Sequence, residues 1–386
     1  MIRKRGQGSH GRAAITPCSP APNLTEAQLL PGNVPGVTDS HLSWPCILNQ
    51  LVSAEDLTPQ QAKWAMGEVM DGSVSPVKLA GFLMGLRTKG ETASELGGLA
   101  AAMLEHAVKI EVPGPTVDLV GTGGDRAHTV NISTMAAVVV AGCGLRVVKH
   151  GNRAATSASG SADVLEALGI RLDHPPARVA QIAVEAGITF CFATVFHPSM
   201  RHAGAARKEL GVPTAFNFLG PLTNPASPAA TAVGCADARM AALMAGVFAE
   251  RGTNALVFRG EDGLDELAAT SSTKVWEVRD GLVTTQVIDA AADLGLTPCS
   301  VEDLRGADAA YNAGIAAAVF DDTLQGPIRE TVLLNAAAAL VVDGSLPGTN
   351  TGILSERLRA GFGLAANAVN TGAALEALDR WRAASA

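Results

Sequence analysis

A glycine-rich turn between two apolar segments holds the residues of this sequence that best suit phosphate chemistry. Residues 117–120 predict a short apolar strand, three glycines follow between 121 and 124, and residues 135–140 predict an apolar helix. Glycines let the backbone turn and approach a ligand closely, and the free amides at a helix start favour an anion. Four neutral hydrogen-bond donors complete the segment: Thr129, Asn131, Ser133 and Thr134.

Asp125, in the same turn, indicates more than a phosphate group. A carboxylate repels a bound phosphate unless it orients a sugar hydroxyl or a cation lies between the two. The turn therefore predicts a phosphorylated sugar that binds together with magnesium. A glycine turn by itself is also found as a plain connection between a strand and a helix, so this interpretation needs support from elsewhere in the chain.

A second turn of the same kind follows in the sequence. Residues 146–153 predict a strand and a polar turn, and small polar residues between 156 and 161 continue it to a predicted helix at 162–168. Two neighbouring turns of the phosphate-binding type imply a ligand with two phosphate groups.

Asp265 and Glu266 form a pair of carboxylates after an apolar strand that ends at Phe258. Magnesium prefers hard oxygen ligands and often bridges carboxylates to phosphates, so the pair suits a site beside a pyrophosphate. A solvated acidic loop is the alternative interpretation. Glu261 and Asp262 lie close by and are easily mistaken for the metal-binding pair.

Four runs of residues carry a resemblance to a known family. These runs resemble the anthranilate phosphoribosyltransferases, the tryptophan-pathway members of the type II nucleoside phosphorylase-like family: GTGGD with TVNIST (121–134), KHGNRAATSASGSADVLEALG (149–169), GVPTAFNFLGPLTNP (211–225) and EDGLDEL (261–267). The order and spacing of the motifs match from about Trp44 to the end of the chain. Roughly the first forty residues match nothing in the family.

The resemblance implies a reaction and a set of site residues. A phosphoribosyl group passes from phosphoribosyl pyrophosphate to the amine of anthranilate, giving N-(5-phosphoribosyl)anthranilate and pyrophosphate in tryptophan biosynthesis, with Mg²⁺ as cofactor. Magnesium is expected at Asp265 and Glu266, with Ser133 at a separate metal site, and anthranilate at Gly121, Asn152 and Arg207. The residues expected to hold phosphoribosyl pyrophosphate are Gly121, Gly124, Asp125, Thr129, Asn131, Ile132, Ser133, Thr134, Lys149, His150, Gly151, Asn152, Arg153, Ala154, Ala155, Thr156, Ser157 and Ser161.

No residue is assigned as a general base. The enzyme is expected to act chiefly by positioning and by charge stabilisation, with Lys149 and magnesium neutralising the leaving pyrophosphate. Four histidines lie near the predicted loops, but loop histidines are more often structural and no Ser/His/Asp or Cys/His arrangement follows from their spacing. They are His128, His150, His197 and His202.

Several of these residues have ordinary alternative explanations. Arg207 lies on a predicted helix, where a solvated face is common, although its planar guanidinium suits the anthranilate carboxylate. Asn152 is otherwise a frequent residue in left-handed turns. The sequence also departs from the family at Thr194, where a proline is usual, and at Arg126, where a small residue is common.

Two other functions are compatible with the same fold. A pyrimidine nucleoside phosphorylase would bind phosphate and a nucleoside, but its Ser-Gly-Arg-type stretch is replaced by residues 149–153 in this sequence. A relative that has lost transferase activity and binds nucleic acid is the second alternative. The net charge of -8 and the intact pair at 265–266 argue against it.

The alternation of strand, polar turn and helix predicts an α/β fold. We expect a small N-terminal helical domain and a large domain with a mainly parallel central sheet covered by helices, with the polar motifs at the carboxyl ends of the strands. Residues 1–40 are expected to be a disordered extension, 41–112 the helical domain and 113–386 the α/β phosphoribosyl-transfer domain. Later helices near 198–226 are candidates to join the helical domain.

The helical domain has clear start signals. Thr58 and Ser75 each precede a proline, as at a helix N-cap, and Thr92 with Glu95 predicts a capping box. About 60 residues of helix bury too little surface alone, and the resemblance implies a homodimer contact in this domain.

Composition limits the class of protein. The chain has 386 residues, of which 47% are hydrophobic and 17% are charged, and it has no apolar run long enough to span a bilayer. Its six cysteines are scattered without CxxC spacing. We therefore expect a cytoplasmic enzyme with reduced thiols that binds small molecules, with no nucleic-acid or membrane partner.

Overall fold

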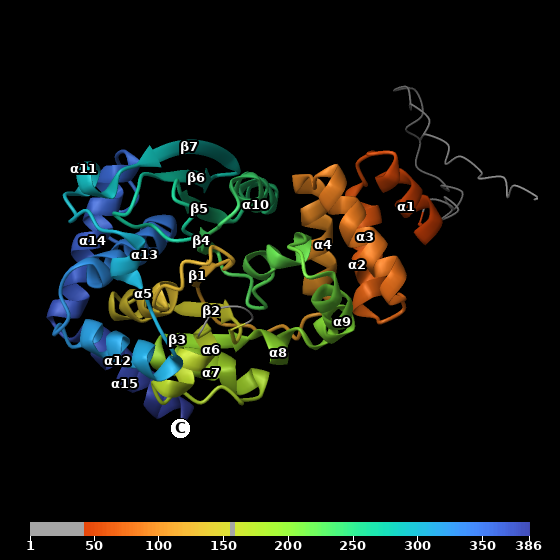
Figure 1. The fold of residues 1–386 in the computed structure, drawn as a ribbon. Coiled ribbons are helices and arrows are strands. Elements are labelled where there is room, and N and C mark those ends of the chain that lie inside the picture. The colour runs from red at the N-terminus through yellow and green to blue at the C-terminus, as the bar shows by residue number, and fades with distance from the viewer. Residues whose placement is uncertain (1–41, 155–158) are drawn as a thin grey trace, which may run out of the picture.

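The computed structural model describes residues 42–154 and 159–386. A bundle of four helices precedes an α/β domain built on one seven-stranded sheet (Figure 1). Predictions for residues 1–40 and for Ala155, Thr156 and Ser157 lie outside the described residues.

Three of the four bundle helices begin where the capping signals predict. Its helices are α1 (Trp44–Val52), α2 (Pro59–Met70), α3 (Pro76–Lys89) and α4 (Ala93–Glu105). The side chains of Thr58, Ser75 and Thr92 each accept a hydrogen bond from a backbone amide in the first turn of the following helix. The predicted capping box of Thr92 and Glu95 is confirmed.

The central sheet has the strand order β3-β2-β1-β4-β5-β6-β7. The first five strands in the chain run parallel to one another, which confirms the predicted mainly parallel sheet. The strands are β1 (Val117–Gly121), β2 (Val147–Gly151), β3 (Ile188–Phe192), β4 (Ala230–Gly234), β5 (Asn254–Gly260), β6 (Thr273–Arg279) and β7 (Leu282–Ile288).

Strands β6 and β7 form an antiparallel hairpin that the sequence analysis did not predict. Asp280 and Gly281 connect them, both with positive φ, and Arg279 pairs with Leu282 across the turn. An Asp-Gly pair between two strand-forming runs is a strong local hairpin signal.

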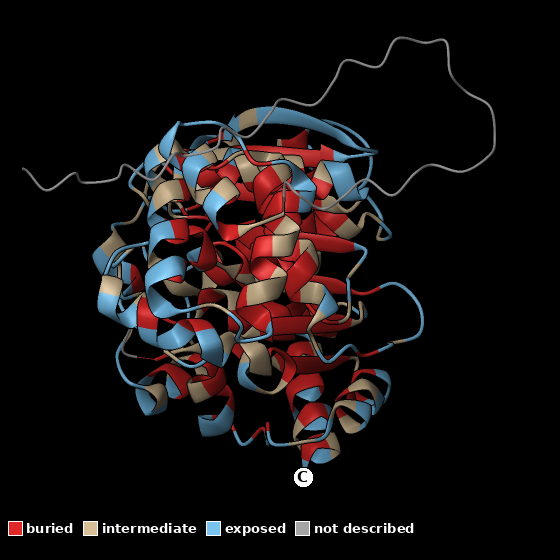
Figure 2. Cartoon of the chain, turned by 90° about the vertical axis from the view of Figure 1, so that its right-hand side faces the viewer, coloured by how far each residue is buried: buried red, intermediate tan, exposed pale blue. Residues whose placement is uncertain are grey.

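Helices cover both faces of the sheet. On one face lie α5 (Ile132–Gly142), α13 (Pro327–Asp343), α14 (Leu354–Asn370) and α15 (Ala373–Ser385), and on the other α10 (Ala238–Arg251) packs against β5, β6 and the bundle helix α4. Figure 2 shows the buried residues concentrated along the strands and the helices next to them. The remaining helices are α6 (Ser161–Ala167), α7 (Pro176–Ala186), α8 (Ala193–Phe196), α9 (Arg201–Leu210), α11 (Ala290–Leu294) and α12 (Ala309–Phe320), with short 3-10 turns at Pro198–Met200, Ala215–Asn217, Gly220–Leu222 and Val301–Leu304.

The two faces of the sheet pack into different hydrophobic cores. Adjacent residues of β4 point to opposite faces, as strand geometry requires: Ala232 joins the core around α5 and α13, and Val233 joins the core shared with the bundle. Helix α9 packs against α2 and α3. The bundle is therefore attached to the sheet through a continuous apolar core, although the exact domain boundaries stay a prediction. No helix in the described part of the chain is long and apolar enough to cross a membrane.

Candidate active site

The strand order reverses between β1 and β4, and parallel sheets bind their ligands at such a point. The last residues of these strands, Gly121 and Gly234, are paired. Asp265 packs directly against both: a Cβ on Gly121 would lie 2.6 Å from Asp265 Oδ2, and a Cβ on Gly234 would lie 1.6 Å from the Asp265 carbonyl oxygen. Only glycine at the two strand ends leaves room for Asp265. Gly121 and Asp265 were predicted as site residues from the sequence, whereas Gly234 was not.

The glycine turn closes onto the same carboxylate. The backbone amide of Gly123 donates to Asp265 Oδ2 at 2.7 Å. Gly123 and Gly124 both have left-handed backbone angles, with φ of 66° and 89°, a conformation that glycine adopts without strain. Asp125 Oδ1 accepts a hydrogen bond from the backbone amide of Ala127 at 3.1 Å. The predicted strand, turn and helix are therefore confirmed, and they bring the turn against the predicted metal pair.

Asp265 and Glu266 are both buried. Burial, reinforced by the neighbouring Asp125 carboxylate, raises the pKa of Asp265 to about 8. Burial and the Asp265 carboxylate also raise the pKa of Glu266 well above its usual range, while Lys149 opposes the shift. The cluster has more negative charge than its surroundings compensate, which suits a bound cation.

Glu261 and Asp262, the acidic residues close to this pair, have different surroundings. Asp262 accepts hydrogen bonds from the Leu264 amide at 3.1 Å and from Thr270 Oγ1 at 2.6 Å, so it builds the turn before the pair. Glu261 is exposed. Among residues 42–154 and 159–386 no group of three or more His, Cys, Asp or Glu side chains forms a metal cage. Magnesium does not require such a cage, because it commonly takes one or two carboxylates and completes its shell with phosphates and water.

Lys149 lies beneath the glycine turn, with only 1% of its surface exposed. Its Nζ donates to the carbonyl oxygen of Leu119 and, at 3.2 Å, to Ser133 Oγ. Burial lowers the pKa of Lys149, and the carboxylates of Asp118 and Glu266 oppose that effect. The lysine therefore joins the predicted phosphate donor Ser133 to the predicted metal pair.

The predicted hydrogen-bond donors at the start of α5 differ in their burial and in their hydrogen-bond partners. Asn131 hydrogen bonds to the carbonyl oxygen of Ser159 at 3.1 Å, which ties the first turn to the end of the second. Ile132 is buried and its amide donates to Val130 O at 2.7 Å. Thr134 is buried too, and its Oγ1 has no hydrogen-bond partner in the described part of the chain. Thr129 forms an isolated bridge with Arg305.

The second turn is held by an acid that the sequence analysis missed. Asp163 Oδ2 accepts from the backbone amides of Ala154 at 3.0 Å and Gly160 at 2.9 Å, and so closes the loop ahead of α6. Arg153 pairs with Asp163 and Glu166, and its guanidinium also lies over the Phe192 ring. A capping acid three residues after a helix N-cap is a recognisable local signal. Gly151 ends β2, and Ser161 begins α6.

His150 and His197 form a buried pair with ring centres 5.1 Å apart. His150 Nδ1 donates to Gly220 O at 3.0 Å, and His197 Nε2 donates to Thr223 O at 2.8 Å. Burial lowers the pKa of each imidazole to about 4. Both rings are therefore neutral at neutral pH.

Arg207 lies on α9, with its guanidinium 5.3 Å from the centre of the Phe216 ring. Burial lowers its pKa, and no carboxylate within the described ranges pairs with it. Asn152 is exposed, and its Oδ1 accepts from the Arg153 amide at 2.8 Å. The structure gives no direct contact between Arg207 and Asn152. The roles of both residues in binding anthranilate stay predictions. Thr194 is exposed in α8, where the chain passes from β3 straight into the helix.

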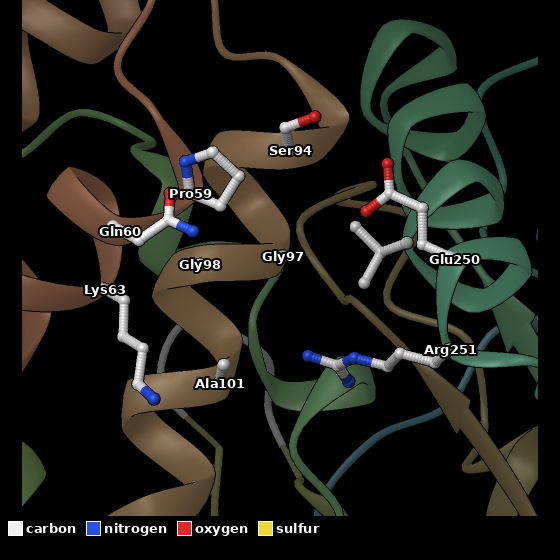
Figure 3. Close-up of a pocket in the computed structure, with 10 residues that line it drawn as sticks. Pro59, Gln60, Lys63, Ser94, Gly97, Gly98, Ala101, Glu250 and Arg251 are labelled. Atoms are coloured by element: carbon white, nitrogen blue, oxygen red, sulfur yellow. The ribbon is translucent and has the colours of Figure 1, made fainter. Parts of the chain in front are cut away.

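A pocket of about 390 Å³ lies elsewhere, between α2, α4 and α10 (Figure 3). Its two cations are partnered, since Lys63 pairs with Glu105 at 2.6 Å and Arg251 donates to Leu222 O at 2.6 Å. None of the predicted site residues lines this pocket. The glycine turn and the acidic pair at the end of the sheet are the better candidate for chemistry.

Comparisons with known proteins identify the family of the chain. The chain matches the model of the glycosyl transferase family a/b domain over residues 113–375 and that of the helical bundle domain of the same family over residues 45–107. It is 57% identical over 343 residues to the anthranilate phosphoribosyltransferase of Streptomyces griseus, covering 89% of this chain and 95% of the relative. The enzyme of the same name from Streptomyces avermitilis is 59% identical over 343 residues, with the same shares covered.

Solved structures give the same result. The anthranilate phosphoribosyltransferase of Thermus thermophilus superposes with a TM-score of 0.81 at 39% identity, covering 88% of this chain and 98% of that one. The enzyme of Saccharomyces cerevisiae in complex with PRPP and Mg superposes with a TM-score of 0.79 at 27% identity, covering 89% and 99%.

Proposed function

This chain belongs to the anthranilate phosphoribosyltransferase family, and from that premise we propose how its residues divide the reaction. The reaction transfers the phosphoribosyl group of phosphoribosyl pyrophosphate to the amine of anthranilate, a step of tryptophan biosynthesis. A bond forms between the anthranilate nitrogen and C1 of the ribose, the bond from C1 to the pyrophosphate oxygen breaks, and the new amine loses a proton.

One observation supports the location of the reaction above all others. Asp265 lies across the ends of β1 and β4, in the space that Gly121 and Gly234 leave open, and it accepts a hydrogen bond from Gly123 in the glycine turn. The acidic pair and the phosphate-type turn therefore share one position, at the point of the sheet where ligands bind.

Magnesium fits the residues at this position. Asp265 and Glu266 offer hard carboxylate oxygens in a buried setting where both pKa values are raised, so a divalent cation would stabilise their charged forms. Ser133 Oγ accepts a hydrogen bond from Lys149 Nζ at 3.2 Å and is proposed as part of a separate metal position. When bound, the metal supplies charge neutralisation for the pyrophosphate oxygens. The structure of the Saccharomyces cerevisiae relative is a complex with PRPP and Mg, which supports this assignment.

The protein's own residues hold the phosphates. The glycine turn and the start of α5 present backbone amides and neutral donors, which suit phosphate oxygens without a large change of local charge. Lys149 lies 3.2 Å from Ser133 Oγ and contributes a positive charge close to the place where the leaving group gains negative charge. The neutral imidazoles at positions 150 and 197 are proposed to shape the site and not to exchange protons.

Arg207 is proposed to bind the anthranilate carboxylate. Its guanidinium is partly buried, rests on an aromatic ring and lacks a carboxylate partner in the described part of the molecule. Such a planar fork can make two parallel hydrogen bonds to a carboxylate. Asn152 and Gly121 are proposed to contact the same substrate from the loops of the sheet.

A homodimer through the bundle and a cytoplasmic location complete the proposal. Helices α1 and α3 pack together and leave apolar side chains at the surface: Val52 is 85% exposed and Val77 82%. We propose that these side chains take part in the contact with a second copy. The location is proposed from the scattered spacing of the six cysteines, which is typical of proteins that keep their thiols reduced. Light scattering of the purified protein would measure the assembly.

The activity is tested by the loss of anthranilate fluorescence in the presence of protein, phosphoribosyl pyrophosphate and magnesium. Loss of signal that requires all three components is the expected result. Phosphate-dependent cleavage of thymidine or uridine, or binding of single-stranded DNA without any loss of fluorescence, would instead support one of the two alternative functions.

A further inference from the structure

Asn312 is a buried asparagine on α12, outside every motif that identifies the family. Only 2% of its surface is exposed. Its Nδ2 donates to Asn131 Oδ1 at 2.8 Å, across 181 residues of sequence, and its Oδ1 accepts from the backbone amide of Ala307 at 2.9 Å. The side chain therefore connects the start of α12 to the glycine turn that precedes α5.

Asn131 passes this connection to the second turn. Its oxygen is occupied by Asn312, so its Nδ2 is the group left to face Ser159, and it donates to Ser159 O at 3.1 Å. An amide side chain can be rotated to exchange its oxygen and nitrogen. The donor on Asn312 fixes which end of the Asn131 amide faces the second turn.

The segment before α12 fastens the glycine turn as well. The Val130 amide donates to Leu304 O at 2.9 Å, and the Gly306 amide donates to His128 O at 2.8 Å. The backbone at His128 has a φ of 54°, a conformation that is strained for a residue with a side chain and needs support from its surroundings. Residues 304–312 thus hold the segment that follows the glycine turn through several hydrogen bonds.

Gly306 is required by how closely this segment approaches. A Cβ at that position would lie 2.8 Å from Asn312 Oδ1, from Thr129 O and from the Val130 amide. A side chain there would push both the glycine turn and Asn312 away. The close approach is therefore built into the sequence at two separate positions, 306 and 312.

We infer that Asn312 is a positioning residue for phosphoribosyl pyrophosphate, acting through Asn131. The inference rests on the proposed role of the 121–134 turn in binding this substrate. Asn312 does not touch the substrate: it holds the Asn131 amide in one orientation and fixes the glycine turn against Ser159 before the substrate arrives. A site held in its productive geometry binds with a smaller loss of conformational freedom.

The variant Asn312→Ala removes the donor and frees the Asn131 amide to rotate. We expect the KM for phosphoribosyl pyrophosphate to rise by about tenfold, the size of effect that one buried hydrogen bond supports. The KM for anthranilate and kcat should change by less than about twofold. The variant Gly306→Ala disturbs the same contact without removing Asn312 and should change the same constant in the same direction.

A double-mutant cycle separates this role from a structural one. In an Asn131→Ala background, Asn312→Ala should have little further effect on the KM for phosphoribosyl pyrophosphate, because the hydrogen bond through which it is inferred to act is already gone. Tyr311→Ala, at the neighbouring half-exposed position on α12, is the matched control and should leave all constants unchanged. Thermal unfolding of each variant measures the folded fraction.

Two results would overturn the inference. If Asn312→Ala lowers only kcat, in proportion to the folded fraction, the residue serves the fold alone. If its effect on KM is undiminished in the Asn131→Ala background, Asn312 does not act through Asn131. A different result is expected if the 121–134 turn does not bind phosphoribosyl pyrophosphate. In that case Asn131→Ala by itself would leave the KM for phosphoribosyl pyrophosphate unchanged.

Discussion

Replacing Gly234 by alanine should disable the active site through a single methyl group. The new Cβ would lie 1.6 Å from the carbonyl oxygen of Asp265 and 2.5 Å from its carbonyl carbon. Both are backbone atoms, so a rotation of a side chain cannot relieve the clash. Since real Cβ contacts are essentially never shorter than 3.0 Å, the two segments must separate by about 1.4 Å.

That movement is large for a catalytic site. A misplacement of about 1 Å can cost on the order of 100-fold in rate, so we expect kcat/KM of Gly234→Ala to fall by about that factor. The magnesium concentration needed for half-maximal activity should rise, because the Asp265–Glu266 pair moves with the backbone. The fold should survive, with a loss of about 1–3 kcal/mol in the free energy of unfolding, as is usual for overpacking.

The assay is the loss of anthranilate fluorescence at varied magnesium and phosphoribosyl pyrophosphate, with thermal unfolding in parallel. Gly363→Ala is the matched control, because Gly363 is exposed on α14 and the added Cβ would meet nothing within 4 Å beyond its chain neighbours and the nearby backbone of its own helix. It should leave activity unchanged and stabilise the protein by about 0.5–1 kcal/mol.

The loss of activity in Gly121→Ala can be compared with that in Gly234→Ala. The Cβ added at Gly121 would lie 2.6 Å from Asp265 Oδ2, a side-chain atom, so the required shift is smaller and the loss of activity should be smaller too. The reasoning is refuted if Gly234→Ala keeps kcat/KM within about twofold of the wild-type value at an unchanged magnesium requirement. Asp265 would then not be held by the strand ends in the way that catalysis needs.

Three further predictions follow from the site. Asp265→Asn combined with Glu266→Gln should weaken the magnesium-dependent activity; a magnesium titration with the same profile as the wild type would remove the pair from the site. Arg207→Ala should raise the KM for anthranilate by about tenfold or more with little change in the KM for phosphoribosyl pyrophosphate, as expected for loss of a charged hydrogen bond, and an unchanged anthranilate KM would show the assignment to be wrong. The pKa of His150 and that of His197 are each lowered from 6.5 to about 4 by burial, so the unfolded chain binds more protons between these values. The free energy of unfolding should therefore fall as the pH drops from 6.5 toward 4, by up to about 3 kcal/mol for each histidine; denaturant titrations should show a shallower pH dependence in His197→Asn, and an equally steep one would exclude this cause.

Local features of the fold were accessible from the sequence because their signals lie within a few residues. The N-caps at Thr58, Ser75 and Thr92 are confirmed, since a side chain there bonds to an amide only two or three positions away. The strand and helix on either side of the glycine turn are confirmed for the same reason. The Asp280-Gly281 turn is an equally local signal, although the hairpin was not predicted.

The sequence by itself determined the α/β class, the polar turns at the strand ends and, through the resemblance of four motifs, the family. The tertiary structure decided which residues share the site and what holds them there. Gly123 meets Asp265 across 142 residues, and Asn312 meets Asn131 across 181. The physical reason is that such contacts depend on the order in which strands join the sheet, and neither hydrophobic period nor capping chemistry records that order. For the same reason a glycine required by a close approach, as at Gly234, looks in the sequence like any other strand end.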